Sequence, residues 1–120
     1  MDRTFLLAGA VAGFIGVAFG AFGAHGLRGR LSPDMLAVFE TGVRYQMYHA
    51  LALLLTGIVA GRVDGRAVAA AGWLFIAGIA LFSGSLYVLS VTGVTAFGAI
   101  TPIGGVALLA GWICLGVASL

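Results

Sequence analysis

Charged and strongly polar residues divide the chain into four apolar stretches. These stretches cover residues 4–24, 45–61, 67–90 and 101–120. An α-helix of about 20 apolar residues crosses the ~30 Å hydrocarbon core of a bilayer. The first, third and fourth stretches reach that length, and the second is shorter. The pattern therefore predicts membrane-spanning helices, of which the second begins before its apolar stretch.

Helix-start signals precede the second and fourth helices. Ser32-Pro33-Asp34 offers a capping hydroxyl, a proline suited to the first helical position and an acidic residue at the positive end of the helix dipole. Thr101-Pro102 repeats the proline signal. We therefore expect helices over about residues 4–24, 33–61, 67–90 and 101–120. The polar segment "GRVDGR" forms a tight turn between the second and third helices.

The composition supports a membrane protein. Of the 120 residues, 62% are hydrophobic and 8% are charged, whereas a soluble domain needs a more charged surface. The first apolar stretch is longer than the core of a usual signal peptide, so we expect it to be retained. The predicted fold is an all-α integral membrane four-helix bundle, with residues 1–120 forming a single transmembrane domain and both termini on the same side.

The arginines decide the orientation only narrowly. Arg3, Arg62 and Arg66 lie on the side of the termini, and Arg28 and Arg30, with Arg44 at the boundary, lie on the other side. Cytoplasmic segments carry an excess of Arg and Lys, which weakly favours cytoplasmic termini. The arginines form no basic stripe, so we expect no nucleic-acid partner.

A glycine seam runs along the first helix. Gly9, Gly13, Gly16, Gly20 and Gly23 are spaced by alternate steps of four and three residues. This spacing places them on one stripe, where small residues allow close contact between membrane helices. The seam predicts a packing face for another helix of the same chain, or for a second copy in a homo-oligomer.

The second predicted helix contains a cluster of polar residues within its apolar sequence. In "FETGVRYQMYHALALLLTG", residues 39–57, Tyr45, His49 and Thr56 share one helical face, with Gln46 beside it. A histidine at membrane depth costs free energy unless it faces the bundle and finds a partner. We therefore expect His49 to point inward, with Tyr45, Gln46 or Thr56 as local partners.

The third helix offers a matching polar face. Ser83, Tyr87 and Ser90 stand at i, i+4 and i+7, on the side of the membrane that also holds the start of the second helix. The candidate binding site is the polar cluster that the topology gathers near this membrane face. It comprises His25, Glu40, Arg44, Tyr45, Gln46, His49, Ser83, Ser85, Tyr87 and Thr101.

The residue types of this cluster are compatible with several kinds of chemistry. An interhelical hydrogen-bond network that fixes the bundle is favoured, and a proton relay through Glu40 and His49 stays open. We expect no metal, because His25, His49 and Glu40 do not form a recognised ligand motif. The two histidines lie at different depths, which disfavours bis-histidine haem. Ser83-Gly84-Ser85 lacks the context of a catalytic serine. We therefore expect neither a cofactor nor an enzyme.

Four segments together resemble a known family. "GAFGAHGL", "FETGVRYQMYHALALLL", "FSGSLYVLS" and "TPIGG…GW" are similar to segments of the small bacterial inner-membrane proteins of the YgdD/YwdK type. That family is a domain of unknown function with a related small transmembrane protein in eukaryotes. The resemblance implies four membrane helices and a location in the bacterial inner (plasma) membrane, and it implies no activity.

Three classes of function are compatible with these features. The first is a non-enzymatic binding or assembly module in contact with membrane lipid, whose small-molecule ligand the sequence does not name. The second is a minimal transporter or channel that uses the cluster around His49 and requires a homo-oligomer. The third is a histidine-based metal or redox membrane protein. The first class fits best, since the chain has neither a soluble domain nor a catalytic motif.

Overall fold

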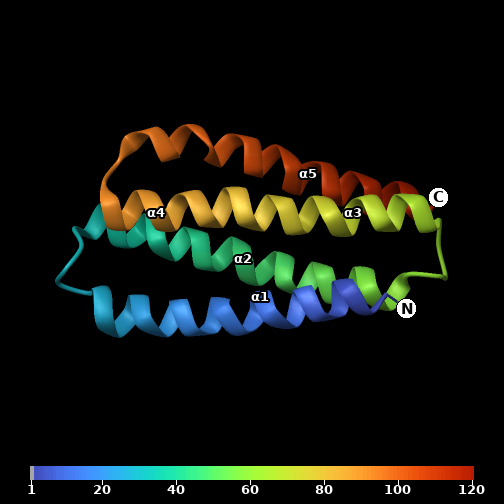
Figure 1. The fold of residues 1–120 in the computed structure, drawn as a ribbon, viewed down its shortest axis with the longest axis horizontal. Coiled ribbons are helices and arrows are strands. Elements are labelled where there is room, and N and C mark those ends of the chain that lie inside the picture. The colour runs from blue at the N-terminus through green and yellow to red at the C-terminus, as the bar shows by residue number, and fades with distance from the viewer. Residues whose placement is uncertain (1) are drawn as a thin grey trace.

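The computed structural model describes residues 2–120 as four helical rods (Figure 1). The first rod is α1 (Arg3–Phe22) with its π-helical extension η1 (Gly23–Leu27), and the second is α2 (Pro33–Val59). The third rod is α3 (Gly65–Gly78), the π-helical turn η2 (Ile79–Ser83) and α4 (Gly84–Thr92). A short 3-10 helix, η3 (Thr95–Ala99), leads into the fourth rod, α5 (Thr101–Ala118). The all-helical class predicted from the sequence is confirmed.

The helix starts follow from local chemistry. The Ser32 hydroxyl accepts a hydrogen bond of 3.2 Å from the backbone N–H of Met35, and Pro33 is the first residue of α2. Asp64 caps α3 by accepting from the N–H of Arg66 at 2.9 Å. The turn before α3 passes through Gly61, whose φ of 90° is accessible to glycine at little cost.

One feature of the third rod differs from the expected uninterrupted helix. The π-helical turn η2 lies between α3 and α4 and shifts the register of the residues that follow it. At this turn α5 approaches closely, because a Cβ on Gly104 would lie 2.7 Å from the Cα of Phe82. Apolar periodicity carries no signal for such a local widening, so the sequence predicted one continuous helix.

Helix α2 lies between the first rod and the third rod and keeps one face exposed. It packs against α1 on one side and against the α3–α4 rod on the other, while α5 packs against α3 and η2 (Figure 1). Both chain ends and the loop from α2 to α3 lie at the same end of the molecule, whose long axis measures 48 Å. The buried core draws on α1, α2, α3 and α5, with Phe5, Leu53, Phe75 and Leu108 as its largest members.

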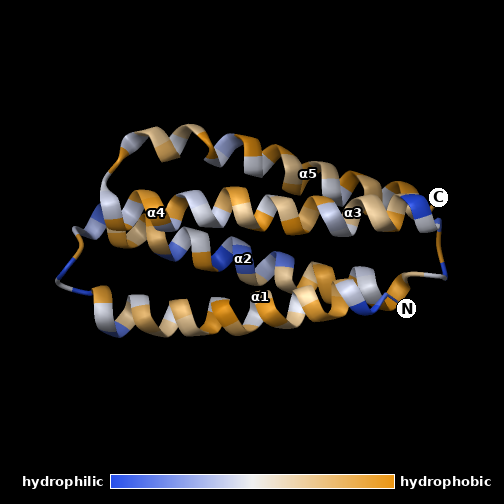
Figure 2. Cartoon of the chain, viewed as in Figure 1, coloured by the Kyte–Doolittle hydropathy of each residue, from blue (hydrophilic) through white to orange (hydrophobic). Residues whose placement is uncertain are grey.

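Polarity is concentrated in α2. Figure 2 shows hydrophilic residues in the middle of α2, where the neighbouring rods are mostly hydrophobic. Three helical segments are long and apolar enough to cross a membrane, namely Arg3–Leu27, Gly65–Thr92 and Thr95–Ala118. Helix α2 is long enough as well, but its polar residues set it apart from those three.

The glycine seam of the first rod, which runs from α1 into η1, lies against α2. A Cβ on Gly9 would lie 2.8 Å from the carbonyl oxygen of Ala50, and one on Gly23 would lie 2.9 Å from the ring of Phe39. Built on Gly13, Gly16 and Gly20, a Cβ would meet Ala50, Met47 and Val43, respectively. Within one chain, therefore, the seam allows the backbones of α1 and α2 to approach closely.

Candidate functional site

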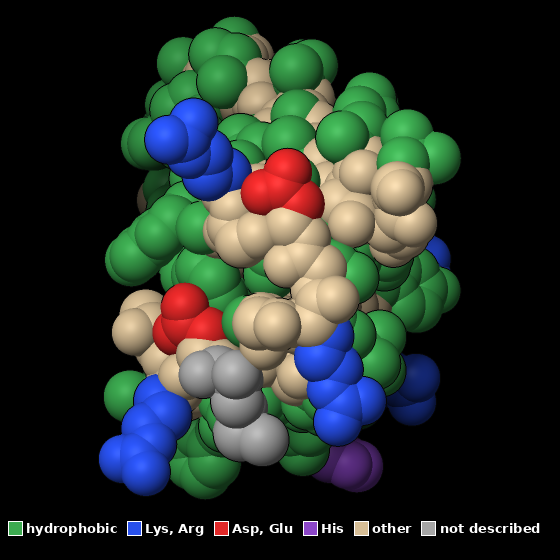
Figure 3. All heavy atoms as spheres, turned by 90° about the vertical axis from the view of Figure 1, so that its right-hand side faces the viewer, with side chains coloured by type: hydrophobic (Ala, Val, Ile, Leu, Met, Phe, Trp, Pro, Cys, Tyr) green, Lys and Arg blue, Asp and Glu red, His purple; other side chains and the backbone are tan. Residues whose placement is uncertain are grey.

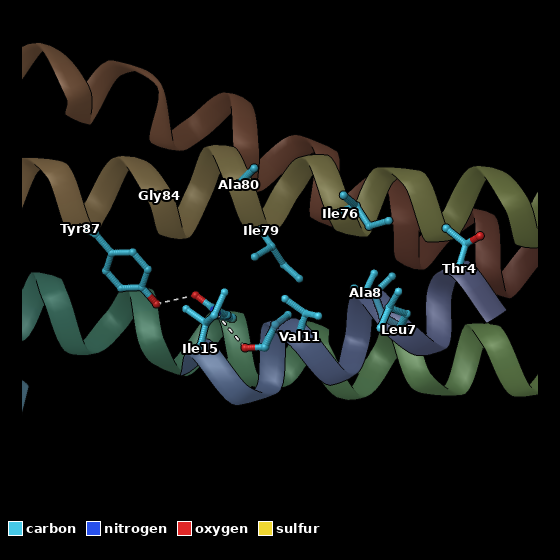
Figure 4. Close-up of a pocket in the computed structure, with 13 residues that line it drawn as sticks. Thr4, Leu7, Ala8, Val11, Ile15, Ile76, Ile79, Ala80, Gly84 and Tyr87 are labelled. Atoms are coloured by element: carbon cyan, nitrogen blue, oxygen red, sulfur yellow. Dashed lines mark hydrogen bonds between the residues drawn. The ribbon is translucent and has the colours of Figure 1, made fainter. Parts of the chain in front are cut away.

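Gln46 joins three helices at the centre of α2. Its Nε2 donates a hydrogen bond of 2.8 Å to the carbonyl oxygen of Ala12 in α1, and its Oε1 accepts one of 2.7 Å from the Tyr87 hydroxyl of α4. Figure 4 draws both bonds, one of them leading from Tyr87. Gln46 is 4% exposed, so its amide groups are satisfied by protein. The arrangement ties α1 and α4 to α2.

A glycine on α2 makes room for Tyr87. A Cβ on Gly42 would lie 2.8 Å from the Tyr87 ring. The hydroxyl of Ser83 donates to the carbonyl oxygen of Gly42 at 2.7 Å, and Ser83 is buried. The small residue thus admits an aromatic ring and leaves a backbone acceptor within reach of the serine.

His49 forms the link between α2 and α5. Its Nδ1 lies 2.6 Å from the carbonyl oxygen of Tyr45, and its Nε2 lies 3.0 Å from the indole Nε1 of Trp112. The indole N–H can only donate, so Nε2 accepts and Nδ1 carries the proton that is donated to Tyr45. These partners fit a neutral imidazole. His49 is 5% exposed, so both ring nitrogens are satisfied in a buried setting.

A pair of hydroxyls joins α4 to α5. The Ser85 hydroxyl donates to the carbonyl oxygen of Phe82 at 2.9 Å, so the Thr101 hydroxyl donates to Ser85 across 2.6 Å. Thr101 stands at the start of α5, where its side chain serves this contact rather than capping its own helix. The pair is a polar contact of α5 with α4, in addition to its contact with α2 through Trp112 and His49.

The structure separates the ten residues of the predicted cluster. It joins Gln46 to Tyr87 and Ser85 to Thr101, and it buries His49 and Ser83. His25, Glu40 and Arg44 are exposed and lie outside these hydrogen bonds. Tyr45 contributes its carbonyl oxygen to His49, whereas its ring is partly exposed beside Phe82. The polar groups therefore form several interhelical links rather than a single compact site.

The sequence analysis missed Trp112 as the partner of His49. The expected local partner Thr56 instead donates to the carbonyl oxygen of Ala52 in its own helix, at 2.7 Å. A tryptophan N–H in an apolar helix usually needs an acceptor, which is the signal that could have indicated the pair. The acceptors on Ala12 and Gly42 are backbone groups, for which side-chain identity gives no signal.

The chemistry of the site is that of a satisfied hydrogen-bond network. Over residues 2–120, every buried side-chain nitrogen and oxygen has a partner. In the same range, no group of three or more His, Cys, Asp or Glu residues could hold a metal ion. Gln46, His49, Ser83 and Ser85 thus act as donors and acceptors between helices.

Two grooves lie beside these links. The first, of about 540 Å³, runs between α1 and the α3–α4 rod, and Gln46 and Leu53 of α2 also line it. Figure 4 shows the side chains of this lining. The second, of about 590 Å³, lies between α2, η2 and α5 and is called the α2–α5 groove here. Its lining includes Tyr45, Tyr48, His49, Phe82, Leu109 and Trp112. Both grooves are predominantly apolar.

The sequence model of the family described as "Protein of unknown function (DUF423)" matches residues 19–105. The chain belongs to the DUF423 family. The matched range contains Gln46, His49 and Tyr87, whereas Trp112 lies beyond it. The expected family resemblance is thereby confirmed, and the description of DUF423 names no activity.

Curated relatives of this DUF423 protein are named as UPF0382 membrane proteins. YwdK of Bacillus subtilis (strain 168) is 50% identical over 118 residues, covering 98% of this chain and 96% of YwdK. A relative from Staphylococcus aureus (strain bovine RF122 / ET3-1) is 49% identical over 117 residues, covering 98% of this chain and 95% of the relative. No solved structure matches the chain. The relatives' names agree with a membrane protein of unknown function.

Proposed function

We propose that this DUF423 protein crosses the bacterial inner membrane with all four helices. In this arrangement it is a non-enzymatic module that binds or assembles with other membrane components. The observation that carries the proposal is the position of α2, whose buried polar groups find their partners within the bundle. The three apolar rods and α2 together then present a mainly apolar exterior.

The dimensions support four crossings. Helix α2 has 27 residues, and at a rise of about 1.5 Å per residue it exceeds the ~30 Å hydrocarbon core. Its polar residues Gln46, His49 and Thr56 are buried, so they need not meet lipid. The 48 Å long axis of the molecule is close to the ~40–45 Å thickness of a bilayer with its headgroups.

The distribution of charge supports the same placement. Figure 3 shows arginine and acidic side chains at the end of the molecule that carries the chain termini. This end includes Arg3, Arg62 and Arg66, and the opposite end includes Arg28 and Arg30. Arginines at both ends can reach phosphate groups of the two leaflets. Three arginines at the terminal end against two at the other, with Arg44 farther along α2, narrowly favour cytoplasmic termini.

The grooves favour binding over transport or catalysis. A solute path needs polar groups free to contact the solute, whereas the amide of Gln46 and the imidazole of His49 are each bonded to two protein groups. The grooves between the helices are apolar, which suits a membrane-dissolved ligand or a neighbouring membrane helix. A transporter would require an oligomer in which Gln46 or His49 gives up its hydrogen bonds within the chain and contacts the solute instead.

Native mass spectrometry of the protein released from nanodiscs of native membrane tests the proposal. We expect a chain, alone or in a small assembly, that retains a membrane-derived molecule. A bare chain without any retained molecule or partner would contradict the binding or assembly role. Stoichiometric metal or haem in the released protein would support the histidine-based alternative instead.

A further inference from the structure

The exposed face of α2 carries a row of polar side chains that take no part in the interhelical hydrogen bonds described above. Glu40, Arg44 and Tyr48 stand at i, i+4 and i+8, so they share one face of the helix. All three are exposed, Tyr48 to 54%. In the described part of the chain, no hydrogen bond or ion pair involves these three side chains, although Glu40 and Arg44 are suitably spaced to pair.

The row leads from the membrane surface into the bilayer. Pro33 begins α2 at the end opposite the chain termini, and each step of four residues advances by about 6 Å. Arg44 is the last charged residue of α2 before Arg62. Arginine and tyrosine side chains in a helix point toward its N-terminus, here toward the headgroups. Glu40 is thus outermost, Arg44 is deeper, and the Tyr48 phenol lies nearest the hydrocarbon.

The α2–α5 groove continues the row into the bilayer. Tyr48 and Tyr45 line it, and their rings lie 5.7 Å apart between centroids. Phe82 lies beside Tyr45, with the ring centroids 4.9 Å apart, and Leu109 adds apolar surface to the lining. The volume of about 590 Å³ lies within the range of ligand sites in proteins, about 300–1,000 Å³. The groove is therefore suited to a hydrocarbon chain that enters beside the tyrosines.

We propose that this row and groove bind one glycerophospholipid whose headgroup carries both a phosphate and an ammonium group. The carboxylate of Glu40 pairs with the ammonium, the guanidinium of Arg44 binds the phosphate, and the Tyr48 phenol donates to an ester carbonyl. One acyl chain lies in the α2–α5 groove. The inference rests on the proposed function, because it needs α2 to cross the bilayer.

Charge complementarity selects this lipid class. A headgroup with one ammonium and one phosphate offers the two charges in the order in which α2 presents Glu40 and Arg44. A glycerol headgroup offers the phosphate alone and leaves the Glu40 carboxylate beside a like charge. Arginine also matches phosphate geometry through paired N–H donors. The site thus prefers phosphatidylethanolamine to phosphatidylglycerol.

The test uses the purified full chain in nanodiscs with equal amounts of phosphatidylethanolamine and phosphatidylglycerol, read by native mass spectrometry. We expect wild type to retain phosphatidylethanolamine several-fold more often. Arg44→Gln lowers retention about ten-fold, the loss of one charge-assisted hydrogen bond, whereas Arg44→Lys keeps most of it. Glu40→Gln abolishes the preference between the two lipids. Tyr48→Phe lowers retention about five-fold.

Arg30→Gln is the matched control, because Arg30 is an exposed arginine on the loop before α2. Arg30 can contact a phosphate only from the loop and does not adjoin the α2–α5 groove, so its loss lowers lipid retention far less than Arg44→Gln does and leaves the preference between the two lipids unchanged. Equal retention of both lipids by wild type, or equal effects of Arg44→Gln and Arg30→Gln, would overturn the inference. So would a dimer without lipid that Arg44→Gln dissociates, since the row would then join two copies. Unselective retention of lipids refutes only this site, whereas a bare, solitary chain also refutes the proposed function.

Discussion

Replacement of His49 by alanine tests the buried network most simply. The substitution removes the hydrogen bond from Trp112, and such interhelical bonds contribute about 0.6–1.7 kcal/mol in membranes. It also removes ring contacts with Phe75 and Trp112, at centroid distances of 5.6 and 5.8 Å, each about 0.5–1.5 kcal/mol. We therefore expect His49→Ala to lower the free energy of unfolding by about 2–4 kcal/mol.

The matched control is His25→Ala. His25 is exposed, and surface substitutions usually change the free energy of unfolding by less than about 0.5 kcal/mol. A third variant, His49→Leu, keeps most of the side-chain volume and loses the hydrogen bonds, so its effect lies between the other two. Unfolding by sodium dodecyl sulfate in mixed micelles measures all three. Equal and negligible effects of His49→Ala and His25→Ala would refute a stabilising buried network.

Two further predictions concern helix packing. Gln46→Leu and Tyr87→Phe each leave a buried partner unsatisfied, so the double variant should be more stable than additivity of the single changes predicts, by about 1 kcal/mol. A strictly additive double-mutant cycle would exclude that coupling. Gly16→Leu should destabilise the fold by about 1–3 kcal/mol, because its side chain enters the space of Met47. Gly116→Leu is the control, since a Cβ there meets no atom within 4 Å, and equal losses of stability would contradict close packing at Gly16.

Much of the fold could be predicted from local sequence patterns, namely charges, capping residues and the spacing of glycines. Charges mark the ends of the rods, and Ser32-Pro33 marks the start of α2, because capping and proline geometry act within a few residues. The spacing of glycines in the first rod indicates one of its faces, and Gly9 of α1 and Gly23 of η1 lie against α2. Such features depend on helical periodicity, which a sequence carries directly.

The partners within the network could not be predicted in the same way. His49 and Trp112 are 63 residues apart, and their contact depends on how α5 docks on the bundle. Gln46 donates to a backbone carbonyl of α1, an acceptor that every residue type offers. The π-helical turn at Ile79–Ser83 reflects the close approach of α5 at Gly104, which is a property of the packed bundle.

The crossing of the membrane by α2 is the central claim, and cysteine labelling tests it most directly. In a Cys114→Ala background, Arg30→Cys reports on the loop before α2 and Val63→Cys on the loop after it. A membrane-impermeant maleimide added to intact spheroplasts should label Arg30→Cys and should label Val63→Cys only after the membrane is opened. Labelling of both positions from the same side would contradict the account, because α2 would then not span the bilayer.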